Sequence, residues 1–224
     1  MIKGLLKKDL YNISSYKTSL VIIILFCSIA IIGTEAINFG SIIICTIVGM
    51  IALSTFNYDE ISKSNKYILA LPTNKKEIVK EKFILCIMSV VIGGILGFIL
   101  TVVVANLMNY LRPQNLINID YETLIISTIG GMWGISLIQS IQIPSIFKWG
   151  AEKGRIQMFV ILFILIGAFL GIGFLITKLS ININIEMIDS LINKFGILFL
   201  VLTMVLMYYI SYKISYKIFK NKEE

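Results

Sequence analysis

The sequence contains no histidine, only three prolines and three cysteines in 224 residues, and only 15% charged residues. An average soluble domain carries ~25% charged residues, so the shortage of charge indicates a membrane protein. The absence of histidine removes the commonest general base and the commonest metal ligand. Cys27, Cys45 and Cys86 lie inside apolar runs without metal-ligand spacing, and we interpret them as packing residues.

Long apolar segments make up most of the sequence. Each is close to the ~20 residues that a helix needs to cross the hydrocarbon of a bilayer, and backbone groups in lipid must be satisfied within helices. The sequence therefore predicts an all-α polytopic membrane protein, one membrane domain over residues 1–224 with six transmembrane helices. The predicted spans are residues 18–33, 37–56, 83–108, 124–143, 156–177 and 195–212.

Basic residues predict the orientation of these spans. All but three of the 20 lysine and arginine residues lie at the two ends of the chain or in alternate connections; the exceptions are Arg112, Lys178 and Lys194. Because cytoplasmic loops carry the excess of basic residues, we predict a multi-pass plasma-membrane protein with both termini in the cytoplasm. The same rule accounts for the net charge of +7 without a nucleic-acid partner.

Residues 1–16 are too polar to span a membrane. Ile2, Leu5, Leu6 and Ile13 recur at helical spacing, which predicts an amphipathic helix with its apolar face in lipid and its lysines toward anionic headgroups. The alternative is an ordinary charged leader before the first span.

Two features inside the spans leave two interpretations each. Ser136, Gln139 and Ser140 form a polar cluster, which predicts either hydrogen bonds between helices or the lining of a transport route. Glycines four residues apart in the third, fourth and fifth spans indicate either close packing within the chain or a contact with another copy.

The longest polar stretch, residues 58–82, separates the second and third spans. Ile61, Ile68 and Leu71 fall near one helical face, and Pro72 ends that helix. The sequence from Asn74 to Glu77 is typical of a helix start, so a second helix is predicted to run into the third span. The first helix needs lipid headgroups or another protein to cover its apolar stripe.

Several blocks resemble one known family. The first comprises Tyr58-Asp59-Glu60, Lys66-Tyr67, Leu71-Pro72 and Lys75-Lys76-Glu77-Ile78-Val79 with Lys82. The second comprises Pro144, Phe147-Lys148, Gly150 and Glu152-Lys153-Gly154-Arg155, and a KKDL motif occupies residues 7–10. With six predicted spans, the chain resembles the short type 2 ABC-transporter permeases, close to those that export phenol-soluble modulins and similar amphipathic peptides from Gram-positive bacteria.

This resemblance implies a bacterial permease that works as an exporter with two ABC ATPase copies and a second permease copy, identical or paralogous. The coupling helix would contact the ATPase through Tyr58, Asp59, Glu60, Lys66, Tyr67, Ile68, Leu71 and Pro72. A second contact would comprise Phe147, Lys148, Glu152 and Arg155. The cargo would be an amphipathic peptide, and ATP and Mg²⁺ would bind the partner rather than this chain.

The residues themselves agree with a chain that is not an enzyme. The sequence has no G-x-x-x-x-G-K-[ST] motif and no nucleophile–base set within the predicted spans. The cargo stays open between peptides, drugs, lipids and a bacteriocin to which the cell would be immune. An alternative of another class is a membrane scaffold or sensor without a motor, in which residues 58–82 would bind a regulator.

Overall fold

The computed structural model describes residues 2–18, 21–25, 37–64, 74–111, 113, 119–178 and 185–221. The long elements in these ranges are all α-helices, as the composition predicts. They are α1 (Ile2–Ser14), α3 (Ile37–Ile61), α5 (Lys75–Leu111), α6 (Tyr121–Trp149), α7 (Ala151–Lys178) and α8 (Ile185–Lys220).

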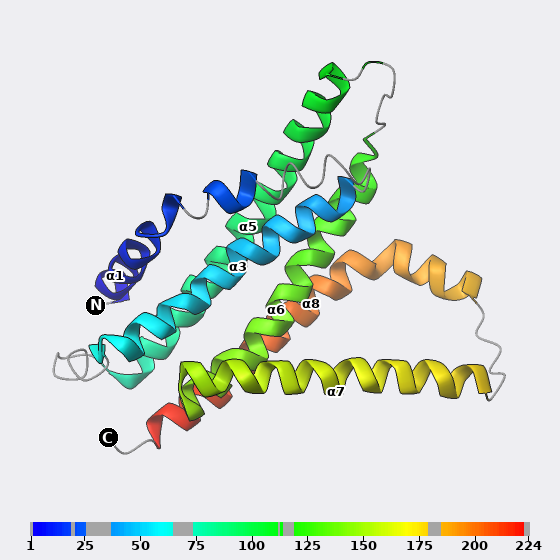
Figure 1. Ribbon diagram of the computed structural model, residues 1–224. Helices are drawn as coiled ribbons and strands as arrows, with labels where there is room; N and C mark the ends of the chain where they lie inside the picture. The colour runs from blue at the N-terminus through cyan, green and yellow to red at the C-terminus, as the bar shows by residue number, and fades with distance from the viewer. Residues whose placement is uncertain are drawn as a thin grey trace.

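The helices form a bundle in which α3 lies along α5, and α6 packs against both α3 and α8 (Figure 1). Helix α1 packs against α3 and α5, whereas α7 meets α6 at Gly150 and then extends away from it (Figure 1). The beginning of α1 and the last turns of α8 lie at the same end of the bundle. We call this the junction end.

Within the described residues, four helices are long and apolar enough to cross a membrane, which confirms the class of polytopic membrane protein. They are Phe39–Ile61, Lys75–Leu111, Tyr121–Trp149 and Phe195–Lys220. The first predicted span, residues 18–33, lies mostly outside the described residues. Six spans therefore stay a prediction.

The helices extend beyond the apolar runs that mark them. Tyr58 to Ile61, which the sequence assigns to a separate cytoplasmic helix, continue α3, and the chain then turns at Lys63, where φ is 49°. Helix α5 begins at Lys75 as predicted, and the Asn74 carbonyl accepts the Glu77 N–H at 2.8 Å. Hydrophobicity marks the lipid-facing part of a helix, whereas capping and turn geometry decide where it ends.

The N-termini of α6 and α8 lie away from the junction end (Figure 1). Asp120 caps α6 by accepting the Glu122 N–H at 3.1 Å, and the Thr123 hydroxyl that donates to the same carboxylate lowers the pKa of Asp120. Residues 185–194 form the first part of α8.

Neutral hydrogen bonds connect α6 to its neighbours inside the bundle. Pro144 has no N–H, so the Ser140 carbonyl one turn earlier loses its helical partner. The Ser211 hydroxyl of α8 donates to that carbonyl at 2.7 Å. Gln139 donates to the Gly49 carbonyl of α3 at 2.9 Å and accepts the Tyr208 hydroxyl of α8 at 2.5 Å. These bonds satisfy polar groups that would otherwise be costly in hydrocarbon.

Close backbone contact between α3 and α5 depends on glycine. A Cβ at Gly97 would lie 2.6 Å from the Ser41 carbonyl oxygen, and one at Gly93 would lie 3.0 Å from the Cys45 carbonyl oxygen. This pair therefore packs within the chain. A Cβ at Gly130 or Gly134 would meet nothing within 4 Å among the described residues.

We predict that Gly97→Ala forces α3 and α5 apart, because the added methyl group meets backbone that cannot rotate away. Overpacking of this kind lowers the free energy of unfolding by ~1–3 kcal/mol. Gly134→Ala is the matched control, since a methyl group in open space on a helix costs nothing and improves helix propensity. Unfolding in mixed micelles measures both; equal stability of the two variants would contradict the close approach.

Candidate functional site

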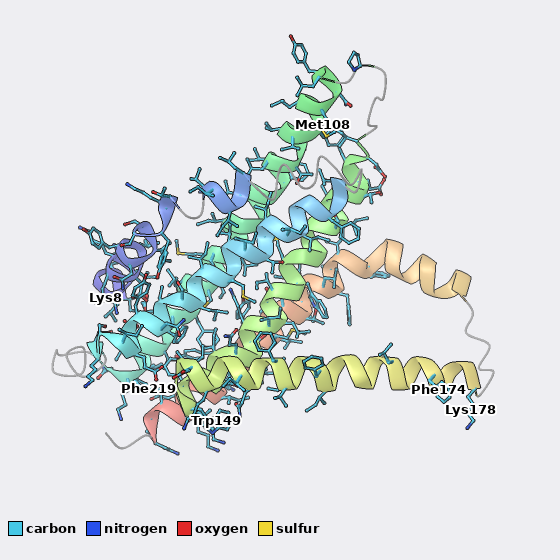
Figure 2. All side chains as sticks on the ribbon, viewed as in Figure 1. Lys8, Met108, Trp149, Phe174, Lys178 and Phe219 are labelled. Carbon is cyan, nitrogen blue, oxygen red and sulfur yellow. The ribbon has the colours of Figure 1, made fainter. Side chains whose placement is uncertain are left out.

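Four charged side chains meet at the junction end of the bundle. Lys8 and Asp9 come from α1, Asp59 from the last turns of α3, and Lys82 from the second turn of α5. We call them the ionic cluster. Asp9, Asp59 and Lys82 are buried, with at most 4% of each residue exposed. In Figure 2, Lys8 lies at the same end as Trp149 and Phe219, and Met108 lies at the opposite end of α5.

Lys82 is the centre of this cluster. Its ammonium bridges Asp9 and Asp59, with Nζ 2.5 Å from Asp59 Oδ2, and it donates to the Thr55 hydroxyl at 3.2 Å. Lys8 bridges the same two carboxylates from the more exposed side, at 3.1 Å from Asp9 and 2.6 Å from Asp59. Two cations therefore face two anions, which is the condition under which buried charge is tolerated.

Apolar and neutral polar groups surround the charges. The Lys82 ammonium lies 5.0 Å from the centroid of the Phe56 ring, and the Ser64 hydroxyl donates to Asp59 at 2.8 Å. Glu81 is buried as well, and its Oε1 atom has no hydrogen-bond partner among the described residues. Removal of any one cluster charge would leave its partners in a site that water does not readily reach.

The cluster changes the interpretation of α1. The sequence assigned the apolar face of this helix to lipid, but Leu5 is buried in the core, and Leu6 and Ile13 pack against it. The reason is Asp9, which needs Lys82 as a partner and draws the helix onto α3 and α5. Asp9 lies one turn from both Leu5 and Ile13 on the apolar face, and this misplaced charge was the signal that could have revealed the contact.

A second joint connects α3 to α7. The Glu60 carboxylate, one residue beyond Asp59, accepts the Ala151 N–H at the start of α7 at 2.5 Å. The first N–H groups of a helix lack partners within it and carry partial positive charge, so a carboxylate stabilises them. Gly150 precedes Ala151 with φ of 90°, and a Cβ there would lie 2.8 Å from Glu60 Oε1. The positive φ favours glycine, and a side chain there would displace the Glu60 carboxylate.

The structure thus brings together the two sequence blocks that resemble the permease family, the one beginning at Tyr58 and the one beginning at Pro144. Asp59 and Phe147 face inward: Phe147 packs edge-on against Phe56, with ring centroids 5.6 Å apart, and touches Phe219. Lys148 lies over the Trp149 ring at 4.2 Å. Tyr58 packs on Tyr16 with centroids 5.5 Å apart. Asp59 and Phe147 therefore hold the joint together rather than presenting a surface.

An exposed hollow of about 680 Å³ opens beside this joint. It is lined by Tyr16, Asn57, Glu60, Ile61, Glu152 and Ile156. These residues come from the segment after α1, the end of α3 and the start of α7. The hollow places the predicted contact residue Glu152 next to Glu60, with both side chains exposed.

The remaining predicted site residues lie either outside the described residues or in the interior of the bundle. Lys66, Tyr67, Ile68, Leu71 and Pro72 lie outside the described residues, as does the side chain of Arg155. Gln139 and Ser140 join helices through the bonds described above, and the Ser136 hydroxyl donates to the Met132 carbonyl at 2.6 Å. Lining of a route by these three residues stays a prediction.

Among the described residues, no three cysteine, aspartate or glutamate side chains are grouped to hold a metal ion. A helical bundle with several helices long and apolar enough to span a membrane defines a polytopic membrane protein.

Comparison with known proteins specifies the class. Residues 4–220 match the family described as ABC-2 family transporter protein, and the chain belongs to that family. The chain is therefore the membrane permease of an ABC transporter, and family membership implies an ABC ATPase as its partner. No curated protein and no solved structure matches it.

We predict that Lys82→Met leaves Asp9 and Asp59 buried with only the partly exposed Lys8 as a shared cation. Breaking a buried ion pair from one side lowers the free energy of unfolding by ~3–5 kcal/mol. The control is the triple variant Asp9→Asn/Asp59→Asn/Lys82→Met, in which the three buried members of the cluster are neutral and only the partly exposed Lys8 stays charged, so most of the stability returns. Denaturation in mixed micelles separates the two, and a single variant as stable as the wild type would refute the cluster.

We predict that Gly150→Ala strains the backbone and displaces the Glu60 carboxylate, at a cost of ~1–2 kcal/mol in stability. Glu60→Ala should also destabilise, because it removes the acceptor from the α7 N-terminus. Combining the two should cost less than their sum, since both break one contact. Gly4→Ala, in open space on α1, is the matched control. Strictly additive losses would show that Glu60 and Gly150 act separately.

Proposed function

We propose that this permease belongs to an ATP-driven exporter that moves amphipathic or hydrophobic peptides out across a bacterial plasma membrane. One observation carries the proposal: consecutive residues of α3 connect to two different helices, Asp59 to α5 through Lys82 and Glu60 to α7 through Ala151. Movement imposed on the end of α3 would reach both helices at once.

The partner ATPase would dock at the exposed hollow beside Glu60 and Glu152, together with the predicted coupling helix over residues 58–71. The sequence contains no ATP-binding motif, so ATP and Mg²⁺ would bind two copies of the partner. Closure of those copies would favour one arrangement of the junction over another, which is a population shift rather than a local chemical step.

The transport route would form between this chain and a second permease copy, identical or paralogous. The described helices present wide apolar surfaces, and long stretches of α5 and α8 are exposed on the faces away from the core. Such walls suit a cargo with an apolar face. An ABC permease for drugs, lipids or bacteriocin self-immunity is the second candidate, and a scaffold without a motor is the third.

The ATPase contact is tested by charge reversal. We predict that Glu152→Lys weakens co-purification of the partner ATPase by about tenfold, because the introduced lysine would oppose an ATPase surface suited to a carboxylate. Glu122→Lys is the matched control, since Glu122 is an exposed glutamate in the first turn of α6, at the other end of that helix. Equal co-purification of both variants would remove the hollow as the docking site.

Transport itself is tested in vesicles that contain this chain with its ATPase. We predict ATP-dependent movement of an amphipathic helical peptide, and its loss in Ile68→Pro, because proline would break the predicted coupling helix. The inserted amount of each protein is measured in parallel. Peptide movement by the chain alone, without nucleotide, would contradict the proposal and favour a protein that needs no motor.

A further inference from the structure

An open apolar groove of about 700 Å³ runs between α5, α6 and α8. Its volume falls in the range of ~300–1,000 Å³ typical of ligand sites. Most of the lining is aliphatic and aromatic, and its charged members are two lysines of α5, Lys76 and Lys80. Neither the ionic cluster nor the hollow beside Glu60 shares these two lysines.

Polarity changes along the length of the groove. On α5 the lining residues begin with Lys76 and Lys80 and continue through Phe83 to Val91, three or four residues apart and therefore on one face. Helix α8 runs the opposite way, so Tyr212 lies near the lysine end and Val201 lies deeper in the bundle. One end of the groove is thus cationic and the rest is hydrocarbon.

The walls of the groove are held by fixed contacts. The Phe83 and Tyr212 rings meet edge-on with centroids 5.6 Å apart. Tyr208, another lining residue, is tied to α6 by its hydrogen bond to Gln139. The groove is therefore present before anything occupies it. Its lysines are exposed, and within the described residues neither forms an ion pair.

We propose that this groove binds an anionic phospholipid, with the headgroup phosphate at Lys76 and Lys80 and an acyl chain along Phe83 to Val91. Basic pockets between transmembrane helices, at the membrane surface, are suited to anionic headgroups. A second protein copy fits less well, because lysine is depleted at the centre of protein–protein interfaces. The site goes beyond the proposed transport function and depends only on α5 crossing the bilayer with Lys76 at its surface.

The experiment measures lipid binding to the purified full-length chain by native mass spectrometry. Delipidated protein is titrated with phosphatidylglycerol and with phosphatidylcholine of the same acyl chains. Wild type should bind one phosphatidylglycerol in preference to phosphatidylcholine. Lys76→Gln/Lys80→Gln should bind phosphatidylglycerol about 30-fold more weakly, since each lysine near an anionic headgroup contributes roughly fivefold.

Two further variants test whether phosphatidylglycerol binding depends on the groove itself. Lys217→Gln/Lys220→Gln removes the same charge from exposed lysines of α8 that do not line the groove, and it should bind phosphatidylglycerol as wild type does. Val91→Trp fills the apolar part of the groove and should weaken the binding of both lipids. Retained co-purification with the ATPase shows that each variant is folded.

Either of two results would overturn the site. The first is equal phosphatidylglycerol affinity in the Lys76→Gln/Lys80→Gln variant and the wild type. The second is a disulfide between two copies that carry Val205→Cys, in a background without the native cysteines, because that would make this groove a chain–chain contact. Since binding is measured without nucleotide or cargo, failure here leaves the export proposal intact, and loss of export leaves this measurement unaffected.

Discussion

The Lys82 ammonium lies between the carboxylates of Asp9 and Asp59 in a site that is closed to water, and three helices meet there. In such a place an unpaired charge is far more costly than a paired one, so α1, α3 and α5 cannot separate independently. Lys8 supplies the fourth charge from the exposed side, and with it the cluster is neutral.

Glu60 extends the same constraint to α7. Because Asp59 and Glu60 are adjacent in the last turns of α3, one short segment holds α5 through an ion pair and α7 through a helix N-terminus. Gly150 makes the second contact possible, since any side chain there would occupy the space of the Glu60 carboxylate. For a permease of the ABC-2 family, which depends on a partner ATPase, a rigid joint at one end allows a push on one helix to move several.

The interior of the bundle is held differently from the junction. There the contacts are neutral: Gln139 between α3 and α8, Ser211 at the carbonyl that Pro144 leaves free, and glycine against backbone where α5 crosses α3. Neutral hydrogen bonds between membrane helices contribute only ~0.6–2 kcal/mol each and can exchange partners. The buried ion pairs thus lie at the junction end, and the neutral hydrogen bonds lie in the interior of the bundle.

The block around Phe147 was singled out only by the family resemblance, whereas composition and hydrophobic pattern were enough to determine a helical membrane protein, the polar stretch from Tyr58, and the start of α5 after Asn74. These features are local, because they depend on the length of apolar runs, on capping residues and on proline. The pairing of Asp9 and Asp59 with Lys82, the cap from Glu60 to Ala151, and the burial of α1 join residues that are 23 to 91 positions apart. Only the tertiary structure decided them, because a charge in the sequence does not show which distant partner will neutralise it once water is excluded.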